Sequence, residues 1–465
     1  MVTDLSLCPK EVLIMSYVIK EKKVDVREEV DILVVGGGPA GIGAAVSAAR
    51  SGKKVMLLEK RGFLGGNITG SYVETCNHFL HGTSFEADGI YKEMEDKYKE
   101  RFDRSHDIRP NSPHRFSSEY LKIFLDDFLQ GEGVELKFHS FVNDVIIEED
   151  KIVCAIIQSK NGPLAIKAKV IIDSTGDGDV AFSAGIPYEQ GRDTDGFCQP
   201  GTVNFRVVGV DVDKLTEDGE DGLKKIGQQF NKDYRAGKTG LTCKRQDLPF
   251  GRLTPAGQVS YINYPCSYMI DPTDVDGLTQ GEIECRQYIM EFYEYAKENF
   301  EGFENIEIAS IAPEIGFRGS RRIKGLYRLN KEDIEAQTIF DDAIATYPRI
   351  FDMLSPDGYM DGDGKVDGGG YKGHIYEPIT DDRFYTIPYR SLLPVGIDNL
   401  LVAGRCISAD HLAESSIRAI SACMITGQAA GAAAGLSCRD KVSPKEIDVK
   451  ELQNVLKGQG VNLPE

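Results

Sequence analysis

A glycine-rich run near the start of the chain has the residue types and the spacing of a loop that binds a pyrophosphate. It reads Gly36-Gly37-Gly38-Pro39-Ala40-Gly41, with Gly43 close behind. Glycines at the G-x-G-x-x-G positions permit a tight turn, close approach of the backbone to phosphate oxygens and close packing of the next helix on the strand. Free N–H groups at the start of that helix favour negative charge. The run predicts a dinucleotide site but does not choose between NAD and FAD.

The elements around this run are those that such a site requires. The apolar stretch Val30–Val35 is typical of a strand buried on both faces. A helix of small residues is expected over Ala44–Ser51 and a second buried strand over Lys54–Glu59. Glu59 follows Gly41 by 18 residues, where a carboxylate can accept hydrogen bonds from a ribose diol. Together these segments predict a βαβ unit that binds a dinucleotide.

Two later turns narrow the choice of dinucleotide. The strand that ends at Asp173 runs into Ser174–Asp179, and a strand over Asn399–Gly404 runs into Arg405, with Asp410 soon after. With the first motif, and in this order, these turns resemble the FAD-dependent oxidoreductases of the glutathione-reductase-type two-domain fold. The resemblance is greatest to the bacterial group related to the flavin subunit of heterodisulfide reductase. It runs from about Val30 to Gly435 and includes residues 64–67, 316–325, 387–390 and 415–418.

The resemblance implies that FAD is the cofactor and gives each matching residue a role. The pyrophosphate would be met by Gly36, Gly38, Pro39, Ala40 and Gly41, and again by Gly404 and Arg405. The adenosine half would be held by Glu59 and Lys60 at its ribose, by the backbone of Val142 near adenine, and by Thr175 and Gly176 over the diphosphate. Gly65, Gly66 and Asn67 would run along the flavin half, with Asp410 near the ribityl chain.

A second helix is expected from about Ser415 to Leu436, and its side chains are unusually small, as in Ala429–Gly435. Small side chains allow it to lie close to the sheet or to the flavin. Its N-terminus, near Ser415–Arg418, could direct free N–H groups at the edge of the flavin that becomes negative on reduction. The alternative is that the small residues only permit packing.

Two groups of side chains are candidates for catalysis. Arg318, Arg321 and Arg322 could bind a carboxylate or stabilise developing negative charge, because guanidinium groups pair with such anions in a bidentate manner. They could equally serve FAD or a domain interface, and Arg390 and Arg418 share this ambiguity. His78 and His81 follow the flavin-side loop and could act as proton acid or base, or be ordinary surface residues.

Composition restricts the partners. A net charge of −19 argues against nucleic-acid and anionic-membrane surfaces, and no 18-residue apolar stretch is present. The ten cysteines include no C-x-x-C pair, which weighs against an iron–sulfur cluster or a structural zinc. The acidic run Asp357–Asp367 lacks the bidentate acid of a calcium loop, so no metal is expected. The expected partners are a small-molecule substrate and an unidentified electron donor or acceptor, in the cytoplasm, and a homo-oligomer stays open.

These observations predict an α/β protein with a three-layer Rossmann-like FAD-binding domain and an inserted mixed α+β substrate domain. We expect a lead-in over 1–29, FAD-binding segments over 30–184 and 386–440, the insertion over 185–385 and a helical tail over 441–465. The predicted function is hydride exchange between non-covalently bound FAD and a small organic substrate at the domain cleft. The alternative is an electron-transfer subunit of a heterodisulfide-reductase-like complex.

Overall fold

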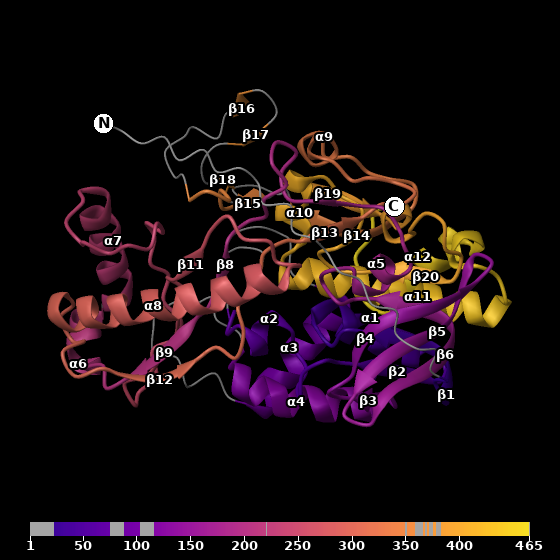
Figure 1. Ribbon diagram of the computed structural model, residues 1–465, viewed down its shortest axis with the longest axis horizontal. Helices are drawn as coiled ribbons and strands as arrows, with labels where there is room; N and C mark the ends of the chain where they lie inside the picture. Colours follow the sequence, from indigo (N-terminus) through magenta and orange to yellow (C-terminus); the bar gives the residue numbers. More distant parts are fainter. Residues whose placement is uncertain are drawn as a thin grey trace, which may run out of the picture.

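A seven-stranded sheet forms the centre of the larger of two lobes (Figure 1). The computed structural model describes residues 23–74, 88–102, 116–219, 221–348, 351–358, 366–367, 370–371, 375–377 and 383–464. The strand order is β3-β2-β1-β6-β5-β4, and β20 also pairs with β6. The strands are β1 (Val26–Val35), β2 (Val55–Leu58), β3 (Glu135–Lys137), β4 (Phe141–Glu148), β5 (Lys151–Ser159), β6 (Gly162–Asp173) and β20 (Leu400–Val402).

The register of this sheet brings the three sequence motifs to one edge. Strands β1, β2, β6 and β20 are parallel, and Val35 lies opposite both Leu58 and Asp173. Asp173 in turn lies opposite Val402. Because parallel strands end at the same edge, the turns that follow them converge there. The first half of β6 also pairs with antiparallel β5, and β5 pairs with antiparallel β4, so these three strands form a β-meander.

Two helices rich in small residues pack on the sheet near the ends of its parallel strands, and their backbones touch each other. They are α1 (Pro39–Ala49) and α11 (Ile420–Asp440). A Cβ added to Gly427 would lie 1.9 Å from the carbonyl oxygen of Ala40, and one added to Gly431 would lie 2.2 Å from that of Ala44. Only glycine fits at these positions. The first helix begins at Pro39 rather than at the expected Ala44, because proline suits the first turn of a helix.

The helix expected from about Ser415 to Leu436 is present over most of its length, but it is interrupted near its start, so the predicted start was wrong. It is divided into α10 (His411–Ile417) and α11, which meet at an angle of 90°. Arg418 closes the first helix and Ala419 adopts an extended backbone at the break. Within the described parts of the chain no single helix is long and apolar enough to cross a membrane. The bent pair has the required length and composition, but its residues are almost all buried in the protein.

The smaller lobe has a hydrophobic core of its own. Its three-stranded sheet has the order β10-β9-β12, from Val259–Ile262, Phe205–Val208 and Glu307–Ile311. Helices α6 (Val212–Leu215), α7 (Gly222–Arg235) and α8 (Val275–Asn299) lie in the same lobe (Figure 1). This core draws on residues from Val203 to Phe317 and on Tyr72, whereas Ile323 and Tyr389 pack in the main core. The domain boundaries given above remain a prediction.

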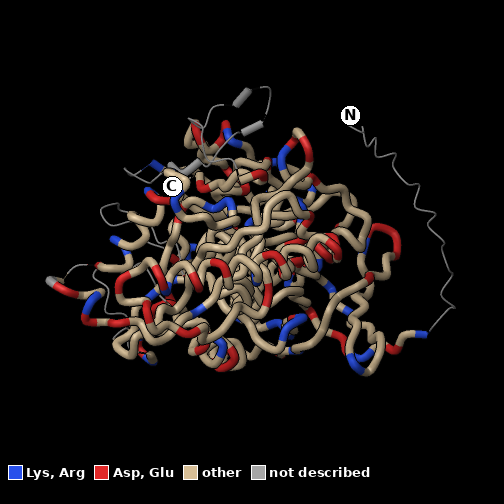
Figure 2. The backbone as a smooth tube through the Cα atoms, turned by 60° about the vertical axis from the view of Figure 1, so that its left-hand side comes forward, with Lys and Arg blue, Asp and Glu red and all other residues tan. Residues whose placement is uncertain are grey.

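The other described elements are short, apart from α3, α4 and α12. The helices are α2 (Asn67–Gly70), α3 (Gly89–Arg101), α4 (Ser118–Gly131), α5 (Asp179–Ser183), α9 (Lys331–Glu335) and α12 (Val449–Gly458), with 3-10 turns at Glu217–Gly219, Tyr389–Leu392 and Pro444–Glu446. The strands are β7 (Tyr188–Gln190), β8 (Gly201–Thr202), β11 (Cys266–Ser267), β13 (Arg321–Ile323), β14 (Ala343–Pro348), β15 (Phe351–Met353), β16 (Val366–Asp367), β17 (Gly370–Tyr371), β18 (Ile375–Glu377) and β19 (Phe384–Pro388). In the view of Figure 2, acidic and basic residues lie interspersed along the chain.

Candidate functional site

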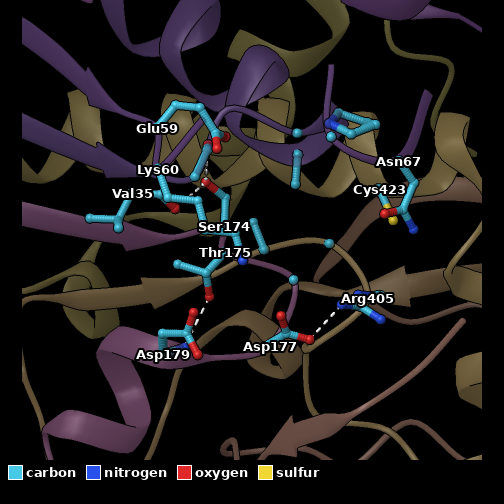
Figure 3. A pocket seen from close by; sticks show the side chains of 18 of the residues that line it. Val35, Glu59, Lys60, Asn67, Ser174, Thr175, Asp177, Asp179, Arg405 and Cys423 are labelled. Carbon is cyan, nitrogen blue, oxygen red and sulfur yellow. Dashed lines mark hydrogen bonds and ion pairs between the residues drawn. The ribbon is translucent and has the colours of Figure 1, made fainter. Parts of the chain in front are cut away.

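A pocket lies where the ends of β1, β6 and β20 converge, and the empty space inside it and at its open mouth amounts to about 930 Å³ (Figure 3). Most residues that the sequence predicted for FAD line it: Gly36, Gly38, Pro39, Ala40, Glu59, Lys60, Gly66, Asn67, Val142, Thr175, Gly176, Gly404 and Arg405. The contributing segments lie between Val35 and Cys423, so the pocket is assembled from both ends of the chain.

The floor of the pocket is a backbone cradle that only glycine can form. Gly36 has a φ of +102°, and a Cβ there would lie 2.5 Å from the carbonyl oxygen of Ser174. A Cβ on Gly41 would lie 1.8 Å from the oxygen of Gly36. Gly41 therefore serves the helix–strand packing rather than the pocket lining. The open backbone at the N-terminus of α1 suits a pyrophosphate, so the residues present fit FAD.

Glu59 is fixed at the end of β2 with its carboxylate facing the glycine loop. Its side chain is 2% exposed. Oε2 accepts a hydrogen bond from the Gly37 N–H at 2.7 Å, and Oε1 accepts one from the Arg61 N–H at 2.9 Å. Arg61, which the sequence analysis did not single out, also lines the pocket and pairs with Glu59 at 3.2 Å. The carboxylate keeps acceptor capacity for the ribose hydroxyls expected there.

The turn after β6 is held by a buried carboxylate and is joined to the turn after β20. Asp173 accepts hydrogen bonds from the N–H and the hydroxyl of Thr175, at 3.1 and 2.7 Å. Asp177 accepts one from Arg405 at 2.5 Å and one from the Ser320 hydroxyl at 2.7 Å. Figure 3 shows the Asp177–Arg405 pair at the edge of the pocket. The sequence marked both turns but gave no sign that these two side chains pair.

Two carboxylates in this turn have opposite pKa shifts. Burial alone would raise the pKa of Asp177, but the guanidinium of Arg405 and the ammonium of Lys60 lower it below its ordinary value. Burial raises the pKa of Asp179 to about 6, and the charges of Asp177 and Asp173 add to the rise. The protein therefore holds one carboxylate charged and a second one easily protonated at the same pocket wall.

The break between α10 and α11 opens on the same pocket, close to the N-terminus of α1. Arg418, Ile420 and Cys423 line the pocket there. The first N–H groups of a helix have no partner within it, and they make its N-terminus favourable for negative charge. The helix N-terminus that was expected to face the flavin near Ser415–Arg418 is therefore that of α11, which begins at Ile420. Burial raises the pKa of the Cys423 thiol to about 12, which disfavours the reactive thiolate.

Three predicted cofactor residues do not line this pocket. Gly41 packs α1 on the sheet, and the Gly65 N–H donates to the Gly37 oxygen at 2.8 Å, which joins the two loops. Asp410 caps α10, accepting from the N–H of Ala413 at 2.6 Å and of Lys331 at 2.8 Å. The predicted roles of these residues stay untested predictions.

The candidate catalytic arginines lie outside the pocket lining and differ in their surroundings. Arg321 pairs with Asp179 at 3.1 Å, and its guanidinium lies over the Phe182 ring at 4.1 Å. Arg322 is buried and donates to the oxygens of Ala409 and Gly191, at 3.0 and 2.9 Å. Arg318 is only partly buried and donates to Pro200 and Thr202. His78 and His81 lie outside the described residues, as does most of the acidic run Asp357–Asp367.

No group of metal ligands is evident in the described structure, and Cys406, which follows Arg405 in the chain, does not line the pocket. No cluster of three or more His, Cys, Asp and Glu residues that could hold a metal ion occurs among the residues described. Cys406 is buried beside the Ala403 oxygen, with Sγ 3.6 Å away, and is not one of the pocket residues.

Comparison with known proteins now decides the family. A family model described as "FAD dependent oxidoreductase" matches residues 31–456. The chain belongs to this family. FAD is therefore its cofactor, and the protein is an oxidoreductase with the Rossmann-type fold described above.

Individual relatives match this oxidoreductase over shorter stretches. A thiamine thiazole synthase from Methanococcus vannielii is 32% identical over 158 residues, which are 32% of this chain and 56% of the relative. A flavin-dependent halogenase from Armillaria mellea is 35% identical over 118 residues, 24% of this chain and 23% of the relative. The match thus covers 56% and 23% of the lengths of these two relatives, less than two thirds of either.

Solved structures resemble the oxidoreductase over most of its length at low identity. A geranylgeranyl bacteriochlorophyll reductase-like protein from Thermoplasma acidophilum covers 93% of this chain, with 84% of its own chain covered. The two share 15% sequence identity, and the TM-score is 0.46.

Proposed function

We propose that this oxidoreductase exchanges a hydride between non-covalently bound FAD and a small organic substrate where the two lobes meet. The observation that carries the proposal is that the first residues of α11 line the same pocket as the glycine cradle. FAD supplies the redox chemistry when it is bound. The protein's part is then to hold the cofactor, position the substrate and stabilise charge.

The described residues divide these tasks between the walls of the pocket. The cradle of Gly36 and Gly38 and the carboxylate of Glu59 would bind the adenosine diphosphate half. The free N–H groups at Ile420 and the guanidinium of Arg418 also line the pocket and favour negative charge. Fixed dipoles of this kind stabilise charge without reorganising during the reaction.

Non-covalent binding is supported by the state of the two nearby thiols. Burial raises the pKa of Cys406 well above its ordinary value, and Cys423 has the raised pKa described above. A thiol that rarely ionises is a poor nucleophile for attachment to a cofactor.

We also propose that the chain has the glutathione-reductase-type two-domain fold. It is supported by the parallel strands β3, β2, β1 and β6 with β20, by the meander and by the second core. A small-molecule substrate and a separate electron donor or acceptor remain part of this proposal.

Anaerobic spectroscopy of the purified holoenzyme tests the proposed function. A panel of small metabolites is added without oxygen while the visible absorbance of the bound FAD is followed. We expect at least one metabolite to bleach the flavin stoichiometrically, or to reoxidise flavin that dithionite has reduced. A holoenzyme whose flavin responds only to a protein partner would contradict the proposal and favour the electron-transfer alternative.

A further inference from the structure

Only Arg318, of the three candidate arginines, keeps its guanidinium charge without a carboxylate partner. Arg321 has Asp179, and Arg322 lies 3.4 Å from the buried carboxylate of Glu414. The Nη1 group of Arg318 donates to the Pro200 oxygen at 2.8 Å and to the Thr202 hydroxyl at 3.0 Å, which are both neutral. Among the residues described, no carboxylate lies within ion-pair distance of Arg318.

Two further arginines lie near Arg318, and the carboxylates beside them are already paired. Arg245 is buried and bound by both oxygens of Asp247, each at 2.9 Å. Arg418 pairs with Asp352 at 3.3 Å. Burial and the guanidinium groups of Arg245 and Arg418 together lower the pKa of Arg318. Three guanidinium groups thus share two carboxylates, and one positive charge is left over.

Hydrogen-bond donors at the same place also lack an acceptor. Gln199 is 1% exposed, and its Oε1 accepts from the Leu354 N–H at 3.0 Å and lies 3.5 Å from Nη2 of Arg418. These contacts orient the amide, so Nε2 is its donor end. Within the described structure, neither Nε2 of Gln199 nor Nε of Arg418 has a partner, although both are buried. Buried donors without acceptors are costly and rare in native proteins.

This group of residues is continuous with the cofactor pocket. Arg418 itself lines the pocket. The carbonyl oxygen of Phe317, next to Arg318 in the chain, accepts from Asn67 at 3.2 Å and from Arg405 at 2.9 Å. Asn67 and Arg405 also line the pocket. A ligand held by Arg318 and Arg418 would therefore lie at the pocket's edge, where the smaller lobe begins.

From the surplus charge and the unmatched donors, we propose that the substrate carries a carboxylate, which binds between Arg318 and Arg418 and accepts from the Gln199 amide. A carboxylate supplies one negative charge and several acceptor sites, and guanidinium groups bind it in a bidentate manner. This inference rests on the proposed function, since it names the class of substrate for the same site.

Equilibrium binding to the oxidised holoenzyme tests the inference without turnover. Acetate, lactate and benzoate are titrated while the visible spectrum of bound FAD is recorded, with acetamide, lactamide and benzamide as uncharged matches. We expect at least one carboxylate to perturb the spectrum saturably and its amide to have no such effect. Arg318→Gln should weaken that binding about ten- to hundred-fold, because charge-assisted hydrogen bonds contribute about 1.5–3 kcal/mol.

The control variants separate this site from other causes. Arg328→Gln removes an exposed arginine paired with Glu189 at 2.8 Å and should leave carboxylate binding unchanged. Arg318→Lys, which keeps the charge, should bind carboxylates more tightly than Arg318→Gln does. If Arg318→Gln does not fold, Arg318→Lys and Gln199→Met replace it, and both should bind carboxylates more weakly than the unmodified protein. A yellow, redox-active holoenzyme that binds no carboxylate more tightly than its amide would overturn the inference alone. So would an Arg318→Gln variant that loses FAD affinity but binds carboxylates normally. A protein that takes up no FAD would instead remove the proposed function.

Discussion

Three carboxylates at the pocket differ in their partners and in their pKa because their surroundings differ. Glu59 accepts from two backbone N–H groups and stays next to the glycine loop. Asp177 is paired with Arg405 and Asp179 with Arg321, yet only Asp179 has a raised pKa, of about 6. The sequence places all three carboxylates at or just after the ends of strands. It does not reveal which arginine each of them meets, because Arg405, for example, is 228 positions from Asp177.

The raised pKa of Asp179 predicts a pH-dependent effect of its removal. Because the folded protein holds this proton more tightly than the unfolded chain does, the free energy of unfolding falls as the pH rises from about 4 through about 6. In FAD-free protein, Asp179→Asn should therefore raise the free energy of unfolding by about 1–3 kcal/mol at about pH 7.5. The gain should shrink towards pH 4, where the native carboxyl is already neutral.

Urea unfolding at the two pH values measures this effect. Asp150→Asn, at the exposed turn between β4 and β5, controls for the general loss of a negative charge. A gain that is the same at both pH values, or a loss at about pH 7.5, would show that Asp179 is not destabilised by its surroundings.

Whole elements were predicted best where a motif ends a strand. The runs at Val30–Val35 and Asn399–Gly404 and the stretch ending at Asp173 each carry β-branched or apolar residues up to a turn, and the structure pairs all three. The break at Arg418 could not be predicted, because Ile417, Arg418 and Ala419 include neither proline nor glycine. At the break, Arg418 donates to the backbone oxygen of Asp352, 66 positions away, a contact that the local sequence does not indicate.

The closeness of Arg318, Arg321 and Arg322 in the sequence also gave no indication that their side chains have different partners. Arg321 and Arg322 lie in β13, where neighbouring side chains point to opposite faces. One therefore meets Asp179 and the other Glu414. The sequence marked a cluster, and only the fold shows that, of these three arginines, Arg318 alone has no carboxylate within ion-pair distance in the described part of the chain.

The contact between α1 and α11 predicts opposite effects for the same substitution at two glycines. Gly427→Ala should lower the free energy of unfolding by about 1–3 kcal/mol, because the new methyl group would meet the Ala40 oxygen at 1.9 Å. Gly131→Ala, at the end of α4 with nothing within 4 Å, should raise it by up to about 1 kcal/mol. Chemical denaturation of both variants provides the measurement. Equal changes in the two would contradict the close helix contact.

At the scale of the whole molecule, the pocket exists only when distant parts of the chain are assembled. Its lining extends from Val35 to Cys423, and the substrate residues proposed here come from the junction with the smaller lobe. FAD binding should therefore stabilise the folded main lobe as a unit. A ligand at 100 times its dissociation constant adds about 2.7 kcal/mol.

The amount of FAD that the protein holds, and the way it is attached, can be measured in one experiment. The purified protein, saturated with FAD and then freed of excess by gel filtration, is precipitated with acid, and the flavin in the supernatant is quantified by absorbance and chromatography. We predict one FAD per chain, all of it released into the supernatant. A protein that retains no FAD, or flavin that stays with the precipitated chain, would contradict a non-covalent site built from these residues.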